Sequence, residues 1–232
     1  MTNILLTGSS RGIGAAIAQA LDTADVSLIG HGTHSGIPAD FDEPAAPRAL
    51  WQTALDRLGG TIDVLINNAG IFEANPLDAE DDAWVAGWER TMRVNLTASA
   101  ELCRLAVLHW QERGVGGRIV NVASRAAYRG DSPAHWHYAA SKAGMVAMTK
   151  TIARGYAAQG ILAFAICPGF TMTGMAEDYL TSRGGDKLLA DIPLGRVAEP
   201  REVAEVARFL ALEAPPSMTG SVIDVNGASY VR

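Results

Sequence analysis

The stretch Asn3-Ile4-Leu5-Leu6-Thr7-Gly8-Ser9-Ser10-Arg11-Gly12-Ile13-Gly14 joins a short apolar run to a glycine-rich turn, and an apolar-periodic segment from Ala15 to Leu21 follows. This pattern is typical of a buried parallel strand leading into a helix. Gly8 permits a tight exit from the strand, Gly12 lets backbone approach a pyrophosphate, and Gly14 lets helix and strand pack closely. The unit predicts a dinucleotide cradle, although its Gly-x-x-x-Gly-x-Gly spacing differs from the commoner Gly-x-Gly-x-x-Gly.

Length and composition bound the remaining possibilities. The 232 residues suit one sizeable α/β domain with no obvious break into two. A net charge of −6 without a basic run argues against nucleic acid and anionic membrane surfaces as partners. We see no N-terminal signal segment and no apolar run near the ~20 residues needed to span a bilayer. Cys103 and Cys167 lie in apolar stretches typical of helix and strand, so we expect a reducing cytoplasm and no disulfide.

The second expected strand, Val26 to Ile29, is not followed by the acid that holds the ribose 2′-hydroxyl in NAD-binding proteins. Arg11 lies in the cradle instead, and His31, Thr33 and His34 follow the strand. All four side chains can contact a 2′-phosphate, which favours NADP(H) over NAD(H). In the alternative interpretation Arg11 is merely solvated and the histidines fill a loop.

The segment from Ser35 to Pro44 is short for a full helix-plus-strand crossover. We expect a brief third strand at Ala39-Asp40-Phe41, with Asp40 and Phe41 flanking the adenine. A helix from about Pro47 to Leu58 should follow and end at a pair of glycines.

The fourth expected strand runs from Asp63 into Asn67-Asn68-Ala69-Gly70. Asparagines at a strand end can bond backbone groups of a neighbouring loop, and Ala69 and Gly70 leave room for a flat ring or a ribose. Without further context the same four residues predict only a turn.

Tyr138 and Lys142 stand four residues apart in a stretch that is typical of a helix. This spacing places both side chains on one face, about 5–6 Å apart at Cβ. An adjacent ammonium favours the phenolate, so we expect a pKa for Tyr138 below the usual value of about 10. Such a tyrosine can exchange a proton in a transition state. Because this spacing also arises by chance on many helices, the pair is evidence for catalysis only together with the other motifs.

Five motifs occur in order along the chain: Thr7-Gly-x-x-x-Gly-x-Gly14, Asn67-Asn-Ala-Gly70, Ser124, Tyr138-x-x-x-Lys142 and Pro168-Gly169. Together they resemble the short-chain dehydrogenase/reductase family over essentially the whole chain. Residues 193–210 and 219–227 look most like bacterial 3-oxoacyl-acyl-carrier-protein reductases. The resemblance implies a single α/β Rossmann domain over residues 1–232, with a doubly wound seven-stranded parallel sheet in the order 3-2-1-4-5-6-7 and helices on both faces. Residues 1–115 would mainly bind cofactor, and residues 116–232 would supply catalytic residues and a lid over 174–194.

The resemblance also implies four catalytic residues. Ser124 would bond the substrate carbonyl, and Tyr138 would donate a proton to its oxygen. Lys142 would bind the nicotinamide ribose and relay a proton from a water held by the carbonyl of Asn95, at a local distortion of the long helix expected from 81 to 112. A turn-forming serine and a solvated asparagine are the alternatives. Cofactor contacts are expected from Gly8, Ser10, Arg11, Gly12, Ile13, Gly14, His31, Thr33, Asp40, Phe41, Asn68, Ala69, Gly70, Tyr138, Lys142, Pro168, Gly169, Thr171 and Thr173.

Aromatic residues surround the expected site. We expect His135, Trp136 and His137 to form a wall of the substrate pocket. The His-x-His pattern has no third ligand at a convincing spacing, so no metal site is predicted. Trp84 and Trp88, four residues apart, suit a core or subunit-contact face.

The favoured function is NADPH-dependent reduction of a 3-oxoacyl thioester by a homotetramer or dimer, with acyl carrier protein or CoA as the candidate carriers of the substrate. Another ketone (polyketide, sugar, steroid or xenobiotic) is the first alternative, and a non-catalytic dinucleotide sensor is the second. Val115 and Gln159 stand where the resemblance places carrier-binding arginines. Arg113, Arg125 and Arg129 are candidates to replace them.

Overall fold

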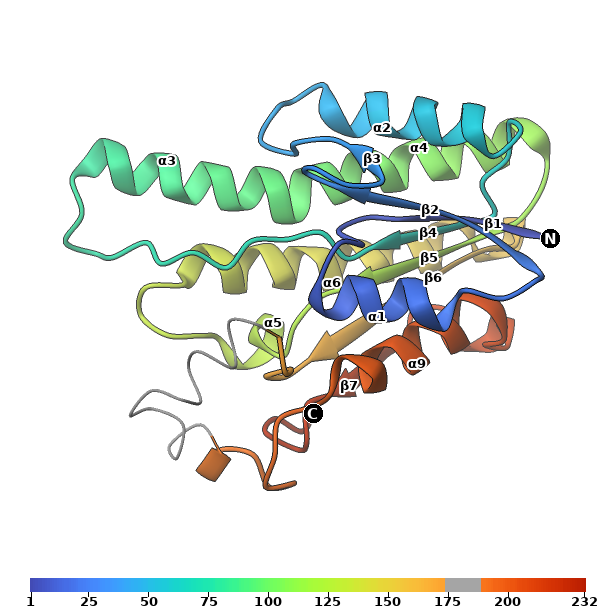
Figure 1. Ribbon diagram of the computed structural model, residues 1–232. Coiled ribbons are helices and arrows are strands. Elements are labelled where there is room, and N and C mark those ends of the chain that lie inside the picture. The colour runs from blue at the N-terminus through green and yellow to red at the C-terminus, as the bar shows by residue number, and fades with distance from the viewer. Residues whose placement is uncertain (174–188) are drawn as a thin grey trace.

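In the computed structural model, which describes residues 1–173 and 189–232, the strands form one seven-stranded sheet. Their order is β3-β2-β1-β4-β5-β6-β7, and all neighbours pair in parallel, so the predicted topology is confirmed (Figure 1). The strands are β1 (Thr2–Leu6), β2 (Val26–Gly32), β3 (Ile37–Pro38), β4 (Val64–Asn67), β5 (Gly117–Val122), β6 (Ile161–Pro168) and β7 (Val222–Val225).

Helices cover both faces of the sheet, as Figure 1 shows: α1 and α9 lie on one side and α2, α4 and α6 on the other. The helix α3 extends beyond the sheet. The helices described are α1 (Gly12–Ala20), α2 (Ala46–Arg57), α3 (Asp81–Met92), the π-helical η1 (Arg93–Thr97), α4 (Ala98–Arg113), α5 (Ala126–Arg129), α6 (Trp136–Tyr156), η2 (Ala157–Gln159), α9 (Pro200–Leu212) and η3 (Pro216–Met218).

The helices on both faces of the sheet explain why its strands are apolar along their whole length. All eight residues of β6 are buried. Phe164 and Ile166 pack in the cluster of α1 and α9, whereas Ile161 and Ala163 pack in the opposite cluster. Because side chains alternate between the two faces of a strand and both faces are covered, the sequence is continuously hydrophobic rather than alternating.

The third strand differs from its prediction. It comprises Ile37 and Pro38, two residues before the expected Ala39-Asp40-Phe41. Gly36, at φ +65°, ends the short turn that follows β2, so the pairing of β3 with β2 begins at Ile37, opposite His31. Pro38 lacks a backbone donor, which suits the edge of a sheet and ends the pairing early.

The long helical stretch from 81 onward is confirmed, including its distortion. The helix α3 passes into the π turn η1 at Arg93–Thr97 before α4 begins. Cys103 and Cys167 are buried free thiols in α4 and β6, the element types predicted. No helix of the described ranges is long and apolar enough to cross a membrane.

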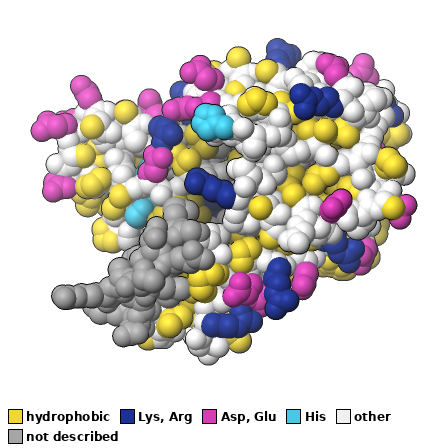
Figure 2. Space-filling model, viewed as in Figure 1, with side chains coloured by type: hydrophobic (Ala, Val, Ile, Leu, Met, Phe, Trp, Pro, Cys, Tyr) yellow, Lys and Arg dark blue, Asp and Glu magenta, His cyan; other side chains and the backbone are white. Residues whose placement is uncertain are grey.

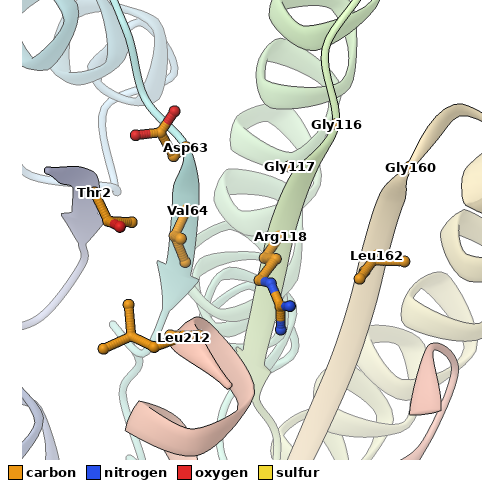
Figure 3. A pocket seen from close by; sticks show the side chains of 10 residues that line it. Thr2, Asp63, Val64, Gly116, Gly117, Arg118, Gly160, Leu162 and Leu212 are labelled. Atoms are coloured by element: carbon orange, nitrogen blue, oxygen red, sulfur yellow. The ribbon is translucent and has the colours of Figure 1, made fainter. Parts of the chain in front are cut away.

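A cavity of about 340 Å³ opens at the amino ends of the strands, lined in part by Thr2, Asp63 and Leu212 (Figure 3). Nη1 of Arg118 donates hydrogen bonds to the carbonyl oxygens of Leu210 (3.0 Å) and Ala214 (2.9 Å). Leu210 lies in the last turn of α9, whose carbonyls have no partner within the helix, and Ala214 lies two residues beyond its end, so Arg118 caps α9. Ligands of open parallel sheets bind at the opposite, carboxyl edge. The functional site is therefore expected at the carboxyl edge of the sheet.

Candidate active site

The cradle after β1 has the close packing that its glycines predict. Gly8 and Gly12 adopt left-handed backbone angles, with φ of +65° and +54°. A Cβ on Gly14 would lie 1.9 Å from the carbonyl oxygen of Gly8. The first turn of α1 can therefore approach the end of β1 only because this position has no side chain. The backbone amides of that turn face the carboxyl edge, where a dinucleotide pyrophosphate binds.

The loop after β4 is fastened to this cradle. Nδ2 of Asn68 donates to the carbonyl oxygens of Thr7 (3.1 Å) and Gly8 (2.9 Å). The hydroxyl of Thr7 accepts from the backbone N–H groups of Asn68 and Ala69, both at 3.0 Å. One asparagine thus bonds a neighbouring loop, as expected, whereas Asn67 donates instead to Asn121 at 2.9 Å in the core. The role of Thr7 was missed, because nothing in a strand-end threonine indicates it.

Asn95 lies in the π turn and is fully buried. Its Oδ1 accepts from the N–H of Ile71 (2.8 Å), its Nδ2 donates to the carbonyl of Ile71 (3.0 Å), and a longer bond reaches Ser141 at 3.3 Å. The alternative of a solvated surface asparagine is therefore excluded. Its backbone carbonyl accepts from Ser99 at 3.4 Å. The proton-relay water remains a prediction.

Ser124, Tyr138 and Lys142 converge at the carboxyl ends of β5 and β6. Ser124 follows β5, and its hydroxyl is hydrogen-bonded to that of Tyr138. Tyr138 and Lys142 lie on α6, with the Lys142 ammonium nitrogen 5.8 Å from the centroid of the tyrosine ring. That nitrogen also donates to the carbonyl of Val122 at 3.0 Å. The three residues that the sequence places apart therefore form one cluster.

Burial, not the neighbouring charge, dominates the acidities of this cluster. It raises the pKa of Tyr138 to about 12, against a smaller lowering by the bond from Ser124. It lowers the pKa of Lys142 to about 8. The expected lowering of the Tyr138 pKa was wrong for this site, because removing both groups from water disfavours the phenolate and the ammonium alike. Tyr138 is thus held in its protonated form at neutral pH.

These residues line a pocket of about 420 Å³. The predicted residues that line it are Ile13, Asn68, Gly70, Ser124, Tyr138, Lys142, Pro168, Gly169, Thr171 and Thr173. Gly70 lies against this cluster, since a Cβ there would be 3.2 Å from Oδ1 of Asn95 and 3.5 Å from Nζ of Lys142. The pocket thus joins the cradle to the proton-transfer cluster, and its residues fit a nicotinamide nucleotide. Residues 174–188 of the expected lid lie outside the described residues.

The residues expected near the adenine and its ribose are arranged differently. His31 is 3% exposed. Its Nδ1 accepts from the N–H of Gly8 (3.3 Å), its Nε2 contacts the carbonyl of Ala39 (3.0 Å), and its ring stacks on Phe41 at 4.4 Å. Burial lowers its pKa. His31 and Phe41 therefore hold the loop after β2 and do not face a phosphate, because both ring nitrogens are occupied.

Polar groups remain at the surface beside this loop: Ser10, Arg11, Thr33 and Asp40 are exposed. Arg11 precedes the first turn of α1 in an extended conformation, with φ −156° and ψ 169°. Asp40 accepts from the N–H of Asp42 at 3.0 Å. His34 of the predicted set is exposed as well, and Arg11 is the member of the set with a permanently charged side chain to offer a 2′-phosphate.

An aromatic wall faces Tyr138, and of the three expected residues His135 belongs to it. Phe72 stacks on His135 with ring centroids 3.9 Å apart and meets Tyr138 edge-on at 4.8 Å. Trp136 is 52% exposed and His137 is 2% exposed, and neither lines the pocket. The prediction for these two was wrong, because adjacent helical residues point in different directions. Phe72 was missed, since it follows the recognised motif by two residues without a signal of its own.

The structure also places the arginines that were candidates for carrier binding and the two tryptophans of α3. Arg125 lines the pocket, and both Arg125 and Arg129 contact Asp191, so neither is an unpaired surface cation of the kind expected to bind an acidic carrier protein. Trp84 and Trp88 stack on each other at 5.6 Å on the extended α3. No cluster of metal-ligating side chains occurs in the ranges described. Acidic and basic side chains are interspersed over the face in Figure 2.

Comparison with known proteins agrees with this geometry. Residues 27–228 match the family described as Enoyl-(Acyl carrier protein) reductase. The chain is 34% identical to a 3-oxoacyl-[acyl-carrier-protein] reductase of Vibrio cholerae, over 98% of this chain and 96% of that protein. It is 34% identical to an acetoacetyl-CoA reductase of Rhizobium meliloti (97% and 97% covered) and 32% identical to a 3beta-hydroxysteroid dehydrogenase of Eggerthella lenta (97% and 92%). The chain therefore belongs to the short-chain dehydrogenase/reductase family and is an oxidoreductase acting on CH–OH or C=O groups.

Proposed function

We propose that this protein is an NADPH-dependent carbonyl reductase that converts a 3-oxoacyl thioester to the 3-hydroxyacyl thioester. The observation that carries the proposal is the convergence of Ser124, Tyr138 and Lys142 in one pocket beside the dinucleotide cradle. Relatives named as 3-oxoacyl-[acyl-carrier-protein] and acetoacetyl-CoA reductases support this choice of substrate.

The residues of the cluster have separate roles in reduction. When bound, NADPH supplies the hydride. The hydroxyl of Ser124 donates a hydrogen bond to the substrate carbonyl oxygen and stabilises the charge that develops there. Tyr138 donates its proton to that oxygen, and its protonated state at neutral pH suits this direction. Lys142 holds the nicotinamide ribose and replaces the proton, with Asn95 fixing the loop against which the lysine lies.

The preference for NADPH rests on the end of β2. No acid follows this strand before Asp40, and Arg11 is exposed at the start of α1. A ribose 2′-phosphate would pair with this guanidinium, whereas NADH offers it only a hydroxyl. Arg11→Gln should therefore raise the KM for NADPH about tenfold and leave that for NADH unchanged. Equal effects on both nucleotides would contradict this assignment.

The test of the reaction is the loss of nicotinamide absorbance with NADPH or NADH and a short 3-oxoacyl thioester. Wild type should turn over rapidly with NADPH, and Tyr138→Phe should lose at least 100-fold in kcat, the scale of general-acid catalysis. Tyr156→Phe, the same change near the other end of α6, is the matched control and should remain active. If NADPH binds but the thioester is untouched, the acyl assignment fails. The steroid dehydrogenase relative makes a panel of cyclic ketones the next substrates.

We propose a homotetramer or dimer in a reducing cytoplasm. Leu108 on α4 and Val85 on α3 are 46% and 48% exposed, so both helices have apolar side chains available for a subunit contact. Both cysteines are free, which suits a reducing compartment. Sedimentation equilibrium tests the assembly. A monomer at micromolar concentration would contradict it.

A further inference from the structure

Arg125 extends a largely buried cation into the substrate pocket. It directly follows Ser124, and its backbone N–H donates to the carbonyl of Pro168 at 2.9 Å, which fixes its position between β5 and β6. The side chain is 11% exposed. The guanidinium lies 4.9 Å from the centroid of the Phe170 ring, and both residues line the pocket. The aromatic face holds the cation in place at the pocket wall.

The charge of Arg125 is only partly compensated. Its nearest carboxylate in the described chain is Asp191, at 3.5 Å. Arg129 already holds that carboxylate through two bonds of 2.5 and 3.1 Å. The Arg125 atom that faces Asp191 is Nη1, which is buried and whose 3.5 Å contact with that carboxylate does not have the geometry of a hydrogen bond. Asp131 also lines the pocket and acts on the guanidinium from a greater distance. Two guanidinium groups thus share one closely bound carboxylate.

A buried guanidinium with an unused donor is costly unless a partner completes it. Arginine stays protonated in proteins, so it cannot relieve the cost by losing its charge. Burial is the largest influence on the pKa of Arg125 and lowers it, while Asp191 and Asp131 oppose the shift. A planar carboxylate matches the fork of a guanidinium and would satisfy the free donor.

We propose that Arg125 binds a carboxylate carried by the ketone substrate. The inference rests on the proposed reductase function and narrows its substrate class to 3-oxoacyl compounds whose acyl chain carries an acidic group. The ketone lies at Ser124 and Tyr138, and the carboxylate lies on the Arg125 side of the same pocket. Phe72 and His135 form the opposite, apolar wall.

The test uses two substrates that differ only in charge. The C1 monomethyl ester of 3-oxohexanedioate has a free carboxylate at C6, whereas the dimethyl ester is neutral. Both present a 3-oxoester in place of the thioester. We expect wild type to prefer the monoacid by about ten- to one-hundredfold in kcat/KM, the range for a hydrogen bond to a charged group. The preference should lie mainly in KM, because the interaction is the same in the ground and transition states.

Three variants separate a pocket cation from a structural ion pair. For Arg125→Gln, kcat/KM should be the same for the monoacid and the dimethyl ester. Arg125→Lys should retain part of the preference for the monoacid. Arg129→Gln is the matched control. It removes the stronger partner of Asp191 but no pocket-lining residue, so it should keep the preference. Equal turnover of the two esters by wild type, or equal loss of the preference in Arg125→Gln and Arg129→Gln, would overturn the proposal.

A binding measurement keeps the inference distinct from the reductase assignment. Monomethyl hexanedioate has no ketone, so calorimetric titration in the presence of NADP⁺ measures carboxylate binding without turnover. Wild type and Arg129→Gln should bind it at least tenfold more tightly than Arg125→Gln does. If this result holds while neither the ketoesters nor the 3-oxoacyl thioester is reduced, the reductase function fails and the carboxylate site stands. Equal affinities in all three proteins would refute the site even if the ketoesters are reduced.

Discussion

Replacing Gly14 by alanine should destabilise the cradle, although alanine is the better helix former. An added Cβ would lie 1.9 Å from the carbonyl oxygen of Gly8 and 2.6 Å from Nδ2 of Asn68. Real Cβ atoms essentially never approach closer than 3.0 Å, so α1 would have to retreat from β1 by about 1 Å. Overpacking of this kind costs about 1–3 kcal/mol, whereas alanine gains at most about 1 kcal/mol in helix propensity. We expect a net loss of about 1–2 kcal/mol from the free energy of unfolding.

The matched control is Gly155→Ala near the end of α6. A Cβ there meets nothing within 4 Å, so the same change should stabilise the protein by up to about 1 kcal/mol. Urea unfolding measures both changes. Fluorescence titration should also show weaker NADPH binding for Gly14→Ala, about tenfold or more, because misplacing a binding element by 1 Å is costly. If Gly14→Ala unfolds within 0.5 kcal/mol of wild type and binds NADPH equally well, the assigned role of this glycine is refuted.

Three further predictions concern buried or capping groups. Asn95→Ala should cost about 2–4 kcal/mol in urea unfolding, because both peptide groups of Ile71 lose their partner, and a loss below 1 kcal/mol would contradict this. Trp110→Phe should cost about 1–3 kcal/mol in the same assay, since its Nε1 donates to the carbonyl of Ile62 at 2.7 Å in the core; an unchanged midpoint would count against it. Bonds from Arg196 and the N–H of Glu199 lower the pKa of Glu202 to about 2, so its contribution is present above pH 4.5 and lost as pH falls toward 2. Glu202→Gln should therefore lower the free energy of unfolding at pH 7 but not near pH 2, by no more than about 1 kcal/mol given the exposure of the pair, and a pH-independent difference would refute this origin.

The sheet and the cluster at its carboxyl edge are predictable because their signals are local and strong. Strands buried on both faces give continuous apolar runs, and the glycine turn fixes where the first helix begins. The order of the strands and the meeting of Ser124, Tyr138 and Lys142 were implied by the resemblance to the family, and the structure has both, since the three residues come from neighbouring elements. The third strand was misplaced because Gly36 sets its start through a backbone angle that the hydrophobic pattern does not encode.

The environment of a side chain is harder to predict than its position. The spacing of Tyr138 and Lys142 predicts their proximity, but the sign of the pKa change depends on how much water reaches them. His31 has the right chemistry for a phosphate, yet its ring turns inward to bond Gly8 and Ala39. Arg125 is adjacent to Ser124 in the sequence, and only its burial against Phe170 distinguishes it from a surface arginine.

The loop of residues 68–72 links the two halves of the site. Asn68 bonds the cradle at Gly8, Gly70 lies against Lys142, and Phe72 packs on His135 and Tyr138. Ile71 lies between Gly70 and Phe72. The buried side-chain amide of Asn95 accepts a hydrogen bond from the N–H of Ile71 and donates one to its carbonyl oxygen.

This arrangement gives the π turn at Arg93–Thr97 a physical reason. A π turn disturbs the hydrogen bonds of a helix and is uncommon, so it persists where the surroundings stabilise it. Here the displaced position is occupied by Asn95, whose amide supplies the loop with two bonds and also reaches Ser141 on α6. A regular helix would rotate this side chain away from Ile71. The distortion therefore places one buried amide where it fixes the cofactor side and the substrate wall together, and a change at Asn95 should disturb nucleotide and ketone binding at once.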